Sequence, residues 1–432
     1  MSKFLVIRLI SYLTIFITYL FFMSIFSPLG VDWLDWHAQR LFNSVEFLKI
    51  TGYFNSYGFS IWTICEDCNL NGPEWKNKIY ISQTRIYLIP YIIINHLFGK
   101  EIFIIIGNIL DKSIIFFIGV IIAEIFFKII KNETIIHKFL LSLFCFTLFV
   151  FSPWVYKMII SSWAEIHFLF YFLISLSLFH YKKIKSGLVL LFLSGITNHM
   201  WTFLIGTYFL ILNFYSKNKK KNFLIKYSFL NKNNIKLKNL FIIILFLPTL
   251  IFLILNSLVK NKYVFFEGSN LLNRIGISGD DIHNGGIIGS LQFLGGNRIT
   301  RCFENININN LTDTIFSFNC LLSTVGMFLL SLISIFGFIL AIKKQNYLKK
   351  YLSSLSFAFL VTICVLQQTM SAHLMGITIV FSIIFSIGLT YYFLWFKNLF
   401  KEKTLNLFFL SPIAFAILIL CIRVNMLTGP NG

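Results

Sequence analysis

The sequence predicts an all-α polytopic membrane protein with about 11 transmembrane helices and two outside loops that carry short amphipathic helices. Three observations predict this class. Of the 432 residues, 57% are hydrophobic and only 12% are charged, whereas a soluble domain is about 25% charged. Apolar runs long enough to span a bilayer alternate with polar segments. Lysines gather in alternate polar segments, as the positive-inside rule describes. A soluble enzyme, a disordered chain and a disulfide-dense secreted module are excluded.

The formal net charge of +20 is explained by membrane topology. Most lysines fall in the segments that the alternation assigns to the cytoplasmic side, where Glu133 and Glu402 are the main acidic residues. The other side holds most of the acids and a similar number of bases. The basic charge therefore marks orientation, and no nucleic acid is expected among the partners.

The N-terminal part is predicted to contain one span and a large periplasmic loop. Residues 1–26 form the first transmembrane helix, with the N-terminus in the cytoplasm because Lys3 precedes the apolar run. No small-residue cleavage site follows, so the helix is expected to remain as an anchor. The periplasmic loop, 27–100, is expected to hold an amphipathic surface helix over 35–53 and a short interfacial segment over 85–98.

The rest of the chain is predicted to form a transmembrane bundle (101–259), a second periplasmic loop (260–318) and C-terminal transmembrane helices (319–432). The expected spans are 113–130, 139–156, 163–181, 240–259, 319–342, 351–370, 374–396 and 404–422, with a basic cytoplasmic loop at 216–238. Residues 186–215 are too few for two spans and too many for one, so two short helices are expected to meet at 197–199. This count places the C-terminus in the periplasm.

Several motifs in the first half share one arrangement. The outside loop opens with Val-Asp-Trp-Leu-Asp-Trp-His at 31–37, and the segment 86–99 ends in Leu-Phe-Gly. Ser152-Pro153, Trp163-Ala164-Glu165 and the stretch 186–197 follow. This arrangement resembles the GT-C class of membrane glycosyltransferases, of the protein mannosyltransferase and aminoarabinose transferase type, which take sugars from polyprenyl- or dolichyl-phosphate. The family's paired Asp-Glu is absent here.

The resemblance implies an inverting glycosyltransferase in a bacterial inner membrane. It would move a sugar from a polyprenyl-phosphate-linked donor, in contact with membrane lipid, to an acceptor at the periplasmic face. Such a reaction needs a base within reach of the acceptor hydroxyl. Asp32 is the favoured base and Asp35 the second candidate, and which of them fills the catalytic role stays open. Residue chemistry also suits Asp32 as a helix N-cap and Asp35 in the first helical turn.

Fixed positive charge near the outer membrane face is expected to bind the donor phosphate. The candidates are His37, Arg40, Arg85, Lys112, Lys157, Arg298 and Arg301. Each is also ordinary in a solvated loop or surface helix, and Lys112 adjoins Asp111, with which it could pair. Glu165 and His373 are candidates for lining a cavity, whereas His167 and His199 are better explained as core residues.

Four cysteines lie in the outside loops, where an oxidising compartment favours disulfides. The local pairs Cys65–Cys68 and Cys302–Cys320 are preferred among three connectivities, and a pairing across the two loops is the alternative. Cys65 and Cys68 have no second pair at zinc spacing. Residues 280–283, Asp-Asp-Ile-His, have ligand types for a divalent metal but lie among turn glycines. No metal or other cofactor is predicted.

Two other functions fit the sequence. An O-antigen polymerase or ligase would use Arg298, Arg301 and His373, and the region of Asp32 would be structural. A flippase or transporter for a lipid-linked sugar would need charged residues along a path through several spans. The ionisable residues of this sequence gather toward the outer ends of the expected spans, which argues against transport. A non-catalytic assembly protein is a further alternative.

Overall fold

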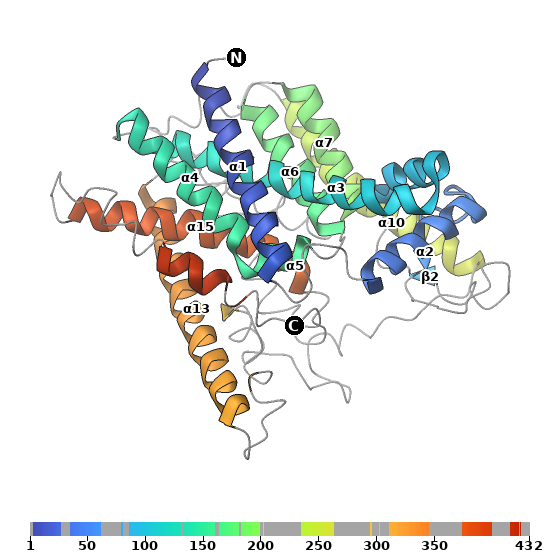
Figure 1. Ribbon diagram of the computed structural model, residues 1–432. Coiled ribbons are helices and arrows are strands. Elements are labelled where there is room, and N and C mark those ends of the chain that lie inside the picture. Colours follow the sequence, from blue (N-terminus) through green and yellow to red (C-terminus); the bar gives the residue numbers. More distant parts are fainter. Residues whose placement is uncertain are drawn as a thin grey trace, which may run out of the picture. The chain divides into compact units, whose positions relative to one another are not determined.

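The computed structural model of the protein is almost entirely helical over the residues that it describes (Figure 1). These are residues 3–26, 35–61, 79–80, 86–130, 133–159, 164–180, 183–198, 202, 235–262, 294–295, 302, 311–344, 374–399, 415–422 and 424. The helical fold class expected from the sequence is therefore confirmed. Two short antiparallel strands, β1 (Ser60–Ile61) and β2 (Ile79–Tyr80), were not expected.

The helices differ widely in length and hydropathy. They are α1 (Lys3–Phe26), α2 (Asp35–Thr51), the 3-10 turn η2 (Ile86–Leu88), α3 (Ile89–Ile129), α4 (Ile135–Phe151), α5 (Pro153–Ile159), α6 (Ala164–His180), α7 (Ile184–Thr197), α10 (Ile235–Lys262), α13 (Leu311–Lys344) and α15 (Leu374–Leu399). Among the described residues, three stretches are long and apolar enough to cross a bilayer: Phe4–Ser24, Asn239–Lys260 and Ser317–Lys343. These apolar helices indicate a membrane protein.

Two helices begin earlier than the apolar runs predict. α10 begins at Ile235, inside the expected loop 216–238, and α13 begins at Leu311, inside the expected loop 260–318. Hydropathy shows where a helix becomes apolar. The boundary of the helix itself depends on a cap, a glycine or a proline, so a helix can begin several residues before its apolar run. The expected span 351–370 and the second helix of the short pair lie outside the described residues.

The chain divides into two compact units. Unit 1 consists of Met1–Asp32, Gly119–Ile160 and Leu271–Gly432, and unit 2 consists of Trp33–Ile118 and Ser161–Asn270. The long helix α3 supplies its first part to unit 2 and its last part to unit 1. Each unit brings together segments that are far apart in the sequence.

Local sequence explains where α3 bends and where α4 ends. Gly99 interrupts α3 with a φ of 79°, a backbone conformation that glycine adopts readily, between the segment expected to be interfacial and the helix beyond it. α4 begins after Thr134, whose hydroxyl accepts from the backbone N–H of His137 at 3.3 Å. It ends at Phe151, and the C-cap residue Ser152 is extended because Pro153 follows. Pro153 then starts α5, since the first helical position needs no N–H donor.

Unit 1 is organised around α15. This helix crosses α13 (Figure 1), where Gly337 and Gly388 leave no room for a Cβ atom on either helix. It also packs against α4 and α5, and Trp154 contacts the ring of Phe381 edge-on, with ring centroids 4.5 Å apart. α1 packs against α4. Close approach of small residues is the usual means by which helices associate in lipid.

In unit 2, α6 and α7 form an antiparallel pair and α7 packs against α10. The hydroxyl of Ser175 donates to the carbonyl of Gly187 at 2.7 Å, and the hydroxyl of Ser194 donates to the carbonyl of Phe168 at 3.2 Å. A Cβ atom on Gly195 would lie 2.6 Å from Cγ of Pro248. Glycine therefore sets the spacing of α7 and α10.

A disulfide joins Cys302 to Cys320 near the start of α13. This is the local pairing that was expected for these two cysteines, whereas Cys65 and Cys68 lie outside the described residues. Among the described residues, Cys145 and Cys421 are free and buried.

Replacing Cys302 with serine is expected to lower the free energy of unfolding by about 3 kcal/mol. The two cysteines are separated by 18 positions, so the bond closes a short loop in the unfolded chain. The measurement is chemical unfolding of the protein in mixed micelles, with Cys320→Ser and the double variant alongside. All three variants should match one another, and wild type treated with reductant should match them. Unchanged stability after complete reduction would contradict the prediction.

Candidate functional site

Most of the residues expected to form the site lie outside the described residues. These are Asp32, Arg85, Arg298, Arg301 and His373. Asp35 is the first residue of α2, as expected for an acidic residue in a first turn, and His37 and Arg40 follow in the same helix. Glu165 is the second residue of α6.

A buried polar cluster that the sequence did not mark as a site lies in unit 2. It consists of Tyr91 and Asp111 of α3 and His167 of α6. The hydroxyl of Tyr91 donates to Oδ1 of Asp111 and lies 3.3 Å from Nε2 of His167. The same oxygen of Asp111 is 3.4 Å from that nitrogen. Three ionisable groups from positions far apart in the sequence therefore meet at one point.

Aromatic rings enclose the imidazole of His167. The ring of Tyr87, in η2, lies 5.2 Å from it at an interplanar angle of 32°. The ring of Tyr91 approaches edge-on at 5.8 Å. His167 was expected to be a core residue, and it is buried, but it is a core residue with an acidic partner. The dry surroundings strengthen the interaction between the carboxylate and the imidazole.

Asp111 occupies the interior face of α3. Its side chain is fully buried, whereas Ile105 and Ile109 on the opposite face are 60% and 58% exposed, as expected for side chains that face lipid. The ion pair suggested for Asp111 and the adjoining Lys112 is not the contact that Asp111 makes. Its carboxylate contacts Tyr91 and His167 instead.

The cluster is connected to the amphipathic helix α2 through a common core. Tyr87 and Tyr91 pack in one apolar cluster with Val45 and Leu48 of α2. Glu46 of α2 also accepts a hydrogen bond from the side-chain amide of a buried residue of α3, Asn95. The helix that begins with Asp35 is thus held against the segment that contacts Asp111 and His167.

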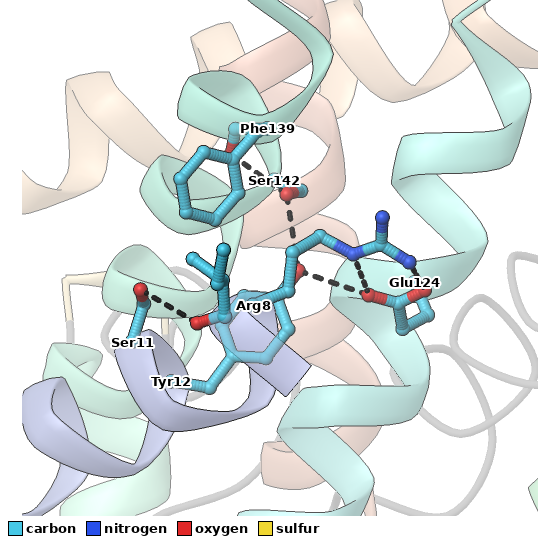
Figure 2. A network of polar contacts seen from close by, with 7 residues as sticks. Arg8, Ser11, Tyr12, Glu124, Phe139 and Ser142 are labelled. Carbon is cyan, nitrogen blue, oxygen red and sulfur yellow. Dashed lines mark hydrogen bonds and ion pairs between the residues drawn. The ribbon is translucent and has the colours of Figure 1, made fainter. Parts of the chain in front are cut away.

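Unit 1 contains a second buried network, in α1, α3 and α4 (Figure 2). Arg8 donates through Nε and Nη2 to the two carboxylate oxygens of Glu124, both at 2.8 Å. The hydroxyl of Tyr12 lies 3.3 Å from Oε1 of Glu124 and 3.0 Å from Oγ of Ser142. The guanidinium also lies 4.2 Å from the ring centroid of Phe127.

The Arg8–Glu124 pair lies away from the helix ends at which the sequence places most ionisable groups. The ionisable groups were expected to gather toward the outer ends of the spans, but Arg8 lies near Lys3 and Glu124 near Lys128, at the ends assigned to the cytoplasm. Glu133, in another segment that the sequence assigns to the cytoplasm, accepts from Lys397 at 3.0 Å and joins the segment before α4 to the end of α15. Sequence reasoning could have marked Arg8 and Glu124 as ionisable residues in apolar helices, but it could not have paired them.

The fold and the buried clusters define a helical membrane protein with two internal polar networks. Comparison of the chain with protein-family models, with curated proteins and with solved structures finds no match.

Proposed function

We propose that the chain is an integral membrane glycosyltransferase that takes its sugar from a polyprenyl-phosphate-linked donor. The acceptor hydroxyl would lose its proton to Asp32 as its oxygen attacks the anomeric carbon. The bond from that carbon to the phosphate oxygen would break, polyprenyl phosphate would leave, and the anomeric centre would invert. Arg85, Arg298 and Arg301 would hold the departing phosphate.

One observation carries the proposal. The amphipathic helix α2, which follows the first span in the sequence, is packed through Tyr87 and Tyr91 onto the buried Asp111–His167 pair. A surface helix fixed to a membrane helix in this way keeps its first residues at the membrane surface, where a lipid-linked sugar is presented. Asp111 and His167 are too deeply buried to touch a substrate, so we assign them the role of positioning η2 and α2.

The proposed topology has about 11 spans in a bacterial inner membrane, with the N-terminus inside and the C-terminus in the periplasm. In unit 1 the disulfide at the start of α13 and the Glu133–Lys397 pair at the end of α15 support it. A disulfide belongs on the oxidising side, and lysine-rich helix ends belong in the cytoplasm.

Asp32→Asn is expected to reduce sugar transfer by about 10²–10⁴-fold, because the amide cannot accept the hydroxyl proton. The measurement is release of free polyprenyl phosphate by the protein in lipid nanodiscs, with a panel of donors and a crude acceptor extract. Asp35→Asn should retain more activity, and Lys49→Ala serves as a surface control. No release from any donor would contradict the proposal. A larger loss in Arg298→Ala than in Asp32→Asn would favour the polymerase or ligase.

Transport of a lipid-linked sugar is a second candidate, favoured by the Arg8–Glu124 pair. Charges at membrane depth often mark a transport path, and this pair joins two apolar helices. The bidentate geometry satisfies both charges, which favours a structural role. In sealed vesicles, a transporter would move the lipid across the membrane without transferring the sugar, and the double variant Arg8→Met/Glu124→Leu would abolish that movement.

A further inference from the structure

Two buried oxygens near the Asp111 cluster accept no hydrogen bond from the described residues. They are Oδ2 of Asp111 and Oδ1 of Asn108. The two oxygens of the Asp111 carboxylate therefore have different surroundings. Oδ1 faces Tyr91 and His167, whereas Oδ2 has no donor within the described part of the chain. Leaving a buried acceptor unsatisfied is costly, and more so when the group carries charge.

The two oxygens belong to one face of α3. Residues three apart on a helix are neighbours, with Cβ atoms about 5–6 Å apart. Asp111 is fully buried, and Asn108 places its oxygen in the interior as well. A positive ion bound by both oxygens would satisfy both acceptors. We propose that Asp111 and Asn108 are ligands of a monovalent metal cation bound inside unit 2.

Charge and ligand chemistry select the class of ion. Carboxylate and amide oxygens are hard ligands, which suit alkali and alkaline-earth cations. The ligands include a single carboxylate, so a monovalent ion places less uncompensated charge at membrane depth than a divalent ion would. Mg²⁺ also retains several water molecules, which a dry interior does not favour. Sodium is therefore the probe.

Neighbouring groups are arranged in keeping with this site. The Tyr91 hydroxyl and the His167 imidazole both face Oδ1, which holds the carboxylate plane in one orientation and leaves Oδ2 for the ion. Lys112, the next residue of α3, projects about 100° around the helix from Asp111 and has contacts of its own. The inference does not require the proposed glycosyl transfer, because ion binding and thermal stability test it without any measurement of activity.

The test is equilibrium binding of radioactive sodium to the full chain in nanodiscs, at constant ionic strength set with choline chloride. The wild type is expected to bind sodium saturably, and Asp111→Asn is expected to lose this binding. Asn108→Ala keeps the carboxylate and is expected to bind sodium about tenfold more weakly, which corresponds to the loss of one ligand. Glu133→Gln, which alters a partly exposed carboxylate of unit 1, serves as the matched control and should bind as the wild type does.

Thermal unfolding gives a second readout that does not depend on any activity. Sodium chloride should raise the Tm of the wild type above its value in choline chloride, because an ion that binds only the folded state stabilises it. If Asp111→Asn does not fold, the Asn108→Ala variant still tests the site through its weaker response. The inference is overturned if the wild type shows no saturable sodium binding, or if Asp111→Asn or Asn108→Ala binds sodium as tightly as the wild type.

Discussion

Gly388→Ala is expected to lower the free energy of unfolding by about 3 kcal/mol, at the upper end of the usual cost of overpacking. A Cβ atom at Gly388 would overlap the carbonyl oxygen of Ser334 and lie 3.1 Å from Cβ of Phe338. A Cβ atom at Gly337 would in turn overlap the carbonyl oxygen of Gly388. These obstacles are backbone atoms, so α13 and α15 must separate along their crossing, and lipid offers no hydrophobic gain to offset that separation.

The matched control is Gly326→Ala, on α13, the helix that α15 crosses. There a Cβ atom would lie 3.2 Å from Cδ2 of Leu420, the end of a flexible side chain, so a change of about 0.5 kcal/mol or less is expected. Unfolding in mixed micelles, followed by circular dichroism, measures both variants. The double variant Gly337→Ala/Gly388→Ala should cost less than the sum of its parts, because either alanine already opens the same contact. Equal stability of Gly388→Ala and Gly326→Ala would disprove the explanation.

Glu124→Leu is expected to lower the free energy of unfolding by about 3–5 kcal/mol. The side chains of Arg8 and Glu124 are only 10% and 19% exposed, and both oxygens of the carboxylate accept from the guanidinium. Removing the carboxylate leaves the guanidinium charged and unpaired among apolar helices. The double variant Arg8→Met/Glu124→Leu should recover most of the loss, because replacing both charges by apolar groups also removes the cost of burying them.

The same unfolding assay compares the loss of this buried ion pair with the loss of a more exposed one. Lys49→Ala removes the pair with Glu46, in which the lysine side chain is 37% exposed, and should change stability by about 0.5 kcal/mol or less. If Arg8→Met/Glu124→Leu is no more stable than Glu124→Leu alone, the free energy of unfolding is lost through altered packing. The unpaired charge of Arg8 is then not the cause.

The described helices show how far hydropathy predicts structure. The extents of α2 and α6 could be predicted closely, because amphipathic spacing and a long apolar run are both local properties of the chain. The starts of α10 and α13 could not be predicted, because each helix begins with a polar turn that precedes its apolar run. Hydropathy shows where a helix becomes apolar. The helix itself is defined by backbone hydrogen bonds, which polar residues form as well, so its start does not have to coincide with the start of the apolar run.

The candidate site was harder to predict than the fold. Asp111 and His167 are both ionisable residues in apolar segments, yet the sequence offers only Lys112 as a partner for Asp111 and explains His167 as a satisfied core residue. Tyr91 lies 20 positions from Asp111 and 76 from His167, and Arg8 lies 116 from Glu124. Nothing in the local pattern connects positions so far apart.

By itself, the sequence determined that this protein is helical, that it is apolar enough for a membrane, and which helix ends are rich in lysine. These properties follow from composition and from periodicity along a few turns, which each segment carries wherever it lies. The tertiary structure decided that Asp111 faces His167, that Arg8 faces Glu124, and that Gly337 and Gly388 bring α13 and α15 into contact. Charge pairing and steric overlap depend on distances between segments, and those distances exist only once the helices have packed.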